Sequence, residues 1–156
     1  QTIPSFFHTL DGISKWNYIY GSSGFIQYQF VVPSKSVYMV KKTLDTLREK
    51  KAYSFLTVLK KFGNSNQGFL SFPENGWTLA IDVPNTGQKL FNVLDDLDEE
   101  LAKCGGKIYL AKDVRQSSVT FKRTYKLLEK WKELKLKMDP EIKFVSDISN
   151  RLEMFN

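Results

Sequence analysis

The sequence predicts an α+β fold: an antiparallel sheet with split-βαβ (ferredoxin-like) connectivity, helices on one face of the sheet, and a helical C-terminal tail. Two stretches, 25–32 and 77–83, alternate apolar side chains as strands do. Two others, 36–50 and 87–104, repeat apolar side chains at the spacing of amphipathic helices. With further short strands, the order is strand, helix, strand, short strand, strand, helix, strand, which is the split βαβ pattern.

The first strand, within Gly24–Pro33, has two different faces. One face is continuously apolar and is expected to face the core: Ile26, Tyr28, Phe30 and Val32. Gln27 and Gln29 lie on the other face, and each carboxamide offers one acceptor oxygen and two donor hydrogens. This pair could hold a hydroxyl-rich ligand. The alternative is that the face simply meets water, and the residues alone leave both open.

The segments on either side of this strand are also predicted to be ordered. Residues 1–23 are rich in aromatic side chains, with a helical turn expected near 13–20. After the strand, Ser34 or Ser36 is expected to cap the helix at 36–50. The predicted buried stripe of that helix is Val37, Val40, Leu44 and Leu47.

The middle of the chain is expected to hold a strand at 53–61, a turn at 63–68, a short strand at 69–72 and the strand at 77–83. The second long helix follows, with a core stripe of leucines: Leu90, Leu94, Leu97 and Leu101. Its acidic residues are interpreted as a solvated face rather than a metal site: Asp95, Asp96, Asp98, Glu99 and Glu100. Gly105-Gly106 is expected to cap this helix before a last strand at 107–110.

The tail is predicted to hold one long helix, capped by Ser117 or Ser118 and ending near 138–140. The buried face expected for it is Phe121, Tyr125, Leu128 and Trp131. A short final helix is expected at 149–154. Because this tail is not needed to complete the split βαβ unit, we expect an appendage or part of something larger.

Composition limits the possible functions. The single cysteine, Cys104, excludes an intrachain disulfide and favours a reducing, cytoplasmic location. The net charge of +6 arises from lysines scattered among acids, so a Lys-rich surface is expected rather than a nucleic-acid partner. There is one histidine, His8, and no Cys/His metal spacing, Gly-rich phosphate loop, nucleophile elbow or membrane-spanning run. Because the chain starts at Gln1 rather than Met, we expect it to be a piece of a longer protein.

Several short motifs in a fixed order resemble the C-terminal part of FAD-linked oxidases of the vanillyl-alcohol-oxidase type. The resemblance is strongest to the decaprenylphosphoryl-β-D-ribose oxidase-like proteins, and it covers nearly the whole chain. The motifs are Phe6–Gly12, Trp16-Asn17, Tyr20-Gly21, Gly24–Pro33, Tyr53–Leu56, Lys60 before Phe62-Gly63, Leu70–Pro73, Gly76-Trp77, Tyr109–Asp113, Asp139-Pro140, Phe144–Asp147 and Arg151-Leu152.

This resemblance implies an FAD-dependent oxidoreductase that oxidises an alcohol carbon of a sugar or polyol-like substrate, lipid-linked or free. Residues 1–107 would be the later part of the substrate-binding (cap) domain, and 108–156 the returning segment associated with the flavin domain. The N-terminal FAD-binding domain would then be a partner from the same protein, and this fragment alone is expected to be inactive. The alternative is a stand-alone split-βαβ ligand-binding or regulatory module without catalysis.

The resemblance also implies site residues. Facing the substrate would be Phe7, Gln27, Gln29, Lys60 and Thr78, and beside the flavin Tyr109 and Lys112. Lys112 is the catalytic candidate, because an ammonium favours the negative charge that grows on a flavin during reduction. The alternatives are that Lys60 is a surface lysine and that Lys112 pairs at the surface with Asp113 or with an acidic residue of a helix. Phe7 replaces a tyrosine of the family, and Thr78 and Ala80 replace Asn and Cys of its mycobacterial members, so the exact substrate is left open.

Overall fold

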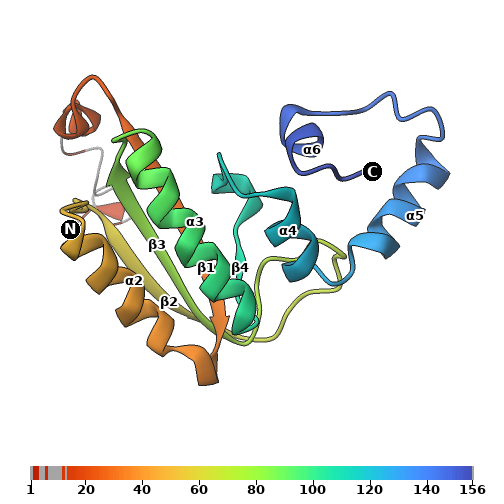
Figure 1. Cartoon of the computed structure of the whole chain (residues 1–156), viewed down its shortest axis with the longest axis horizontal. Helices are drawn as coiled ribbons and strands as arrows, with labels where there is room; N and C mark the ends of the chain where they lie inside the picture. The colour runs from red at the N-terminus through yellow and green to blue at the C-terminus, as the bar shows by residue number, and fades with distance from the viewer. Residues whose placement is uncertain (1, 4–5, 7–11, 13, 156) are drawn as a thin grey trace.

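The computed structural model of the protein describes residues 2–3, 6, 12 and 14–155. In this part of the chain, four strands form one antiparallel sheet in the order β2-β3-β1-β4. The strands are β1 (Phe25–Pro33), β2 (Thr57–Phe62), β3 (Gly76–Pro84) and β4 (Lys107–Ile108). The predicted α+β class and antiparallel sheet are therefore confirmed (Figure 1).

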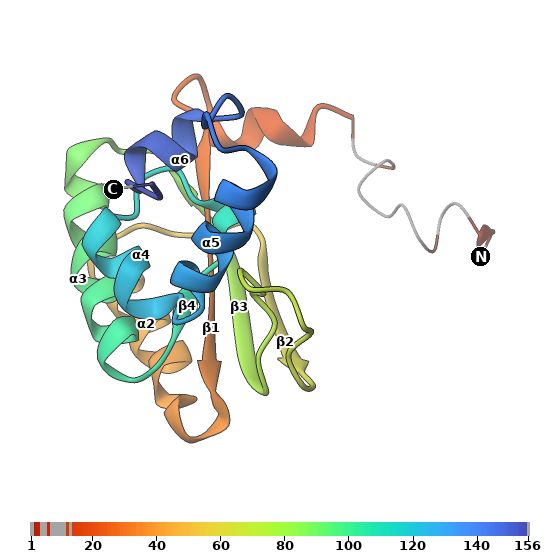
Figure 2. The same ribbon diagram turned by 90° about the vertical axis from the view of Figure 1, so that its right-hand side faces the viewer.

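Two helices, α2 (Tyr38–Glu49) and α3 (Gln88–Lys103), cover one face of this sheet (Figures 1 and 2). The alternating apolar side chains of both long strands meet these helices in one apolar core. Its strand residues are Ile26, Tyr28, Phe30, Val32, Leu79, Ile81, Val83 and Ile108. All four leucines of the predicted α3 stripe are buried there. The alternation and the helical spacing thus identified the core correctly.

The start of α2 differs from the prediction. Residues 34–36 form a 3-10 turn, η3 (Ser34–Ser36), and neither serine caps the helix. The Ser36 hydroxyl instead donates to the carbonyl oxygen of Cys104 at 3.1 Å. Val37 and Leu44 are exposed, while Met39 and Thr43 are buried. The buried face is therefore rotated, because the helix begins only after the turn that contains the expected caps.

Two predicted strand segments are also corrected. Strand β2 begins at Thr57, later than expected, and residues 69–72 form no strand. Phe72 is buried because its ring stacks on Tyr109 at 4.5 Å and meets Phe62 edge-on at 5.9 Å. Ring packing, rather than strand pairing, therefore accounts for this apolar segment.

Two glycines are required where the sheet meets its turns. A Cβ at Gly76, the first residue of β3, would lie 1.9 Å from the carbonyl oxygen of Val32, so no larger residue fits. Gly105 has φ +82°, and the Gly106 N–H donates to Leu101 O at 2.8 Å. This left-handed residue ends α3 as predicted.

The C-terminal segment lies on the β4 side of the sheet (Figures 1 and 2). It contains η4 (Leu110–Lys112), α4 (Ser118–Thr124), α5 (Leu128–Met138) and α6 (Asp147–Arg151). Ser117 caps α4 as predicted, accepting from the Thr120 N–H at 3.1 Å. The prediction of a single long helix is wrong, because residues 125–127 are not helical and separate α4 from α5. At this interruption, the buried Tyr125 hydroxyl donates to Ile108 O at 2.6 Å.

The C-terminal segment has an apolar core separate from that of the sheet. Its buried members are Phe121, Tyr125, Leu128, Leu152 and Met154. The break between α4 and α5 thus keeps the predicted apolar face together in two helices instead of one. The last helix also lies earlier than predicted, because Ser146 caps it by accepting from the Ser149 N–H at 3.3 Å.

Candidate functional site

The helix-free face of the sheet carries two polar pairs that join β1 to β3. Gln27 lies directly opposite Asp82, and its Nε2 donates to Asp82 Oδ1 at 2.9 Å. Gln29 Nε2 donates to the Thr78 hydroxyl at 3.1 Å. Both glutamines therefore project away from the helices. Within the described chain, no side chain or backbone group donates to either glutamine Oε1, so each retains an acceptor for a ligand.

The β3 partners of these glutamines are buried, although they are polar. Thr78 is 1% exposed and Asp82 is 3% exposed. The Tyr20 hydroxyl also donates to Asp82, at 3.4 Å, and the Tyr20 ring stacks on Phe25 at 4.3 Å. One end of the face is therefore closed by aromatic side chains, and Thr78 is reached through Gln29 rather than directly.

Lys60 and Tyr109 flank the same face. Lys60 is exposed on β2 and lies directly opposite Thr78. Tyr109 follows β4, and its N–H donates to Gln29 O at 2.8 Å. The structure thus brings Gln27, Gln29, Lys60, Thr78 and Tyr109 to one face of the sheet. Phe7, the remaining predicted substrate residue, lies outside the described residues.

Lys112 ends η4. It is partly buried and lines a small hollow with Gln27 of the helix-free face, with Ile26 and Tyr28 of the core face, and with Arg115. The hollow therefore lies at the edge of β1, between the two faces of the sheet. The Lys112 Nζ has no hydrogen bond or ion pair with any described residue. The Asp113 carboxylate is bonded instead by Arg151 Nη2 at 2.8 Å. Lys112 is therefore not paired with Asp113, which was the alternative expected from the sequence.

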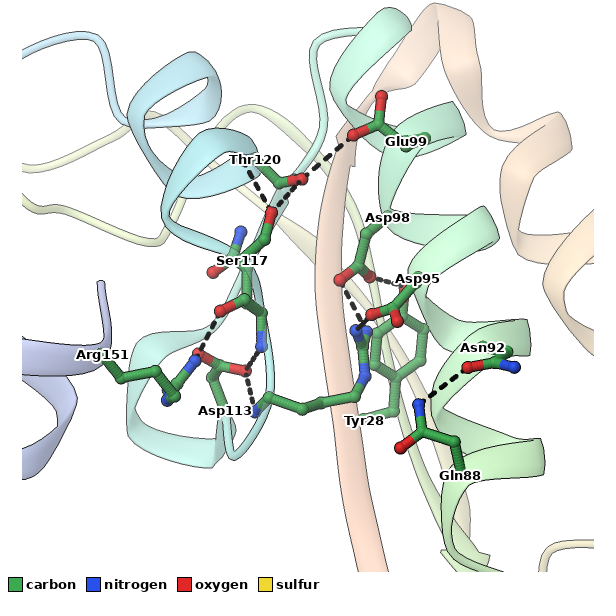
Figure 3. Close-up of polar contacts among 12 residues, drawn as sticks. Tyr28, Gln88, Asn92, Asp95, Asp98, Glu99, Asp113, Ser117, Thr120 and Arg151 are labelled. Carbon is green, nitrogen blue, oxygen red and sulfur yellow. Dashed lines mark hydrogen bonds and ion pairs between the residues drawn. The ribbon is translucent and has the colours of Figure 1, made fainter. Parts of the chain in front are cut away.

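Asp98 is a buried charge that the sequence analysis missed. It was assigned to a solvated acidic face, but it is 2% exposed. The Tyr28 hydroxyl donates to Asp98 Oδ1 at 2.8 Å, and Arg115 Nη2 donates to Asp98 Oδ2 at 2.6 Å (Figure 3). The signal was present, since Asp98 stands four residues after Leu94 and three before Leu101, on the buried side of α3.

Burial controls the ionisation of this cluster. It raises the pKa of Asp98 to about 7, while Arg115 and the Tyr28 hydroxyl act in the opposite direction. The pKa of Tyr28 is raised well above its usual value, first by burial and then by the Asp98 charge. Asp98 is thus the described carboxyl group whose charge changes near neutral pH.

The described residues contain no group of three or more His, Cys, Asp or Glu side chains that could hold a metal ion. Across the same part of the chain, no helix has the length and apolar character needed to cross a membrane.

Comparison with known proteins identifies relatives of this chain. The chain is 39% identical, over 154 residues, to decaprenylphosphoryl-β-D-ribose oxidase of Mycolicibacterium smegmatis (strain ATCC 700084 / mc(2)155). The match covers 99% of this chain and 33% of that oxidase. The chain is a homologue of part of this oxidase. The resemblance inferred from the sequence motifs is thus confirmed.

A second relative, an uncharacterized protein in the mprA 5′ region of Streptomyces coelicolor, is 41% identical over 95 residues. That match covers 61% of this chain and 26% of the relative. No family model matches the chain. The chain spans about a third of the length of the M. smegmatis oxidase.

Proposed function

We propose that the chain is part of an FAD-dependent oxidoreductase that oxidises an alcohol carbon of a sugar or polyol-like substrate. Residues 1–107 would form the later part of its substrate-binding domain, with split-βαβ connectivity, and 108–156 would be a segment that returns to the flavin domain. The observation that carries this proposal is the 39% identity to a ribose oxidase over 154 residues. The two separate apolar cores support the division near residue 107.

The helix-free face suits an uncharged sugar. Gln27 and Gln29 each present an acceptor oxygen for a hydroxyl donor, and their Nε2 groups are held by Asp82 and Thr78. Exposed Lys60 supplies donors for a hydroxyl or for a phosphate oxygen, as in a lipid-linked sugar phosphate. Thr78 acts through Gln29, because it is too buried to contact a ligand without rearrangement.

The residues near β4 fit one edge of a flavin. Lys112 offers an ammonium without a partner among the described residues, and Tyr109 offers an aromatic ring next to Gln29. The sequence has no Gly-rich loop for the pyrophosphate, so the rest of the cofactor would be held by another domain. A flavin supplies the hydride acceptor for oxidation of a carbinol carbon. The role of Lys112 would be to favour negative charge at that edge.

The test is the flavin content of two proteins. The 156-residue chain should purify without stoichiometric flavin, because backbone donors of phosphate-binding loops normally hold the pyrophosphate. The complete reading frame includes any coding sequence upstream and downstream of residues 1–156. Protein expressed from it should be yellow and carry one flavin per chain.

Two results would contradict the proposal. A reading frame without a flavin-binding domain would favour the stand-alone ligand-binding or regulatory module. If the 156-residue chain bound stoichiometric flavin by itself, the proposal that another domain holds most of the cofactor would be wrong.

A further inference from the structure

The loop that carries Lys112 is held by a buried carboxylate immediately after it. The Asp113 side chain is 3% exposed. Its Oδ1 accepts from the backbone N–H groups of Arg115 at 3.0 Å and Gln116 at 2.8 Å. Its Oδ2 accepts from Arg151 of α6 at 2.8 Å (Figure 3). One side chain therefore fixes both the turn after Lys112 and the position of that turn relative to α6.

The same turn is anchored to α3 through Arg115. This side chain is 7% exposed, pairs with Asp98 and Asp95, and lies over the ring of Tyr28. Arg151 also donates to the carbonyl oxygen of Gln116 at 2.5 Å. On the other side of Lys112, its N–H donates to Tyr109 O at 3.0 Å. The backbone on both sides of Lys112 is thus fixed, although its Nζ is free within the described chain.

We propose that Asp113 is a positioning residue, which holds the backbone of the 112–116 loop so that the Lys112 ammonium stays at the edge of the helix-free face. A lysine side chain has several rotatable bonds, so its position depends on where its Cα is held. The inference rests on the proposed function, because Lys112 has a role only if a flavin and a substrate lie at that edge.

A purely structural role for Asp113 is the rival explanation, and Asp139 provides a matched control. The Asp139 side chain is 8% exposed. It accepts from the backbone N–H groups of Lys143 and Phe144, both at 2.9 Å, and pairs with Lys135. Like Asp113, it binds two backbone N–H groups and one basic side chain, but in a loop that does not contain Lys112. Asp139→Ala should loosen its own loop and leave Lys112 unaffected.

The first readout is amide hydrogen exchange in the 156-residue chain. In Asp113→Ala, the amides of Arg115 and Gln116 should exchange about tenfold faster, because each loses a hydrogen bond to a charged acceptor. In Asp113→Asn, which keeps one acceptor oxygen, and in Asp139→Ala, they should stay near the parent rate. If Asp113→Ala does not fold, Arg151→Met takes its place, with faster exchange at Gln116 expected. Unchanged exchange at both amides would overturn the proposal.

The second readout is the flavin midpoint potential in protein from the complete reading frame. Lys112→Met should lower it, because a positive charge that favours the reduced flavin is lost. Asp113→Ala removes a negative charge and would raise the potential if Lys112 stayed in place, but should lower it if Lys112 moves. The double variant should be no lower than Lys112→Met. Asp113→Asn removes the same negative charge but keeps the loop in place, so it should raise the potential.

The outcomes separate the two proposals. If Lys112→Met lowers the potential but Asp113→Ala raises it or leaves it unchanged, the positioning role of Asp113 is wrong and the role of Lys112 stands. If Lys112→Met leaves the potential unchanged, both the role of Lys112 and the positioning role of Asp113 are wrong. A complete reading frame that binds no flavin overturns the proposed function itself, and the positioning role of Asp113 with it.

Discussion

At the scale of single residues, the two glutamines of β1 are not equivalent. Gln27 satisfies the buried carboxylate of Asp82, whereas Gln29 satisfies the neutral hydroxyl of Thr78. Leaving a buried charge without a donor destabilises a fold more than leaving a hydroxyl without one. The sequence showed that both carboxamides share a face, but not this difference, because Asp82 and Thr78 lie about 50 residues later in the chain.

This difference predicts distinct effects of leucine at the two positions in the complete enzyme. Gln29→Leu should lower kcat/KM by the factor that corresponds to about 0.5–1.5 kcal/mol, because one hydrogen bond to a sugar hydroxyl is lost. Both variants should lower Tm, and Gln27→Leu should lower it more, because a buried carboxylate rather than a hydroxyl loses its donor. Steady-state kinetics and thermal unfolding of both variants provide the check. If the double leucine variant turned over substrate normally, this face would not be the substrate site.

At the scale of elements, local pattern predicted β1, β3 and α3 well, and failed where distant partners decide the structure. In the sequence, Asp98 is one of several acidic residues of a charged helix. In the structure it is buried, and Arg115 and Tyr28 donate hydrogen bonds to it. The apolar spacing at 121–131 continues through a break, because the Tyr125 hydroxyl is bound to Ile108 on β4. Strand alternation predicted that Gln27 and Gln29 share a face, whereas Lys60, Thr78 and Tyr109 were implied only by the resemblance. Of the ion pairs that hold the Lys112 loop, only the burial of Asp98 had a local signal, in its spacing from Leu94 and Leu101.

The buried contact between α3 and the C-terminal segment predicts a pH dependence of stability. Because burial raises the pKa of Asp98 to about 7, the folded state binds a proton that the unfolded state releases at lower pH. Stability should therefore fall as pH rises from about 4 to about 7, by at most about 1.4 kcal/mol per pH unit for one proton. Tyr28, Arg115 and Asp113 face Asp98 and set the size of this effect.

Urea unfolding of the parent and of Asp98→Asn at about pH 5 and about pH 8 checks this prediction. At the lower pH the protonated acid resembles the amide, so the two proteins should be close in stability. At the higher pH the parent should lose stability relative to the variant. A difference that stayed constant between the two pH values would show that Asp98 does not titrate in this range.

At the scale of the whole molecule, the chain consists of a sheet with two helices and a C-terminal segment with its own core. From the sequence we expected a sheet with helices followed by a helical C-terminal tail. Polar contacts that join the two parts appear only in three dimensions. Arg115 pairs with Asp98 and Arg123 with Glu99, and the Thr120 hydroxyl also donates to Glu99 (Figure 3). The Asp98–Arg115 contact holds the loop that carries Lys112 against α3 and the edge of β1.

The central claim is that this chain supplies the substrate face and Lys112 to a flavin-dependent oxidation. The most direct test mixes decaprenylphosphoryl-β-D-ribose anaerobically with protein from the complete reading frame, and follows loss of the oxidised flavin absorbance. The parent should be reduced, and Lys112→Met should be reduced about 10²–10³ times more slowly, because one preorganised charge is missing. A Lys112→Met rate within a factor of about two of the parent would leave Lys112 only a surface role. A parent flavin that neither this sugar nor any other polyol reduces would contradict the proposed function.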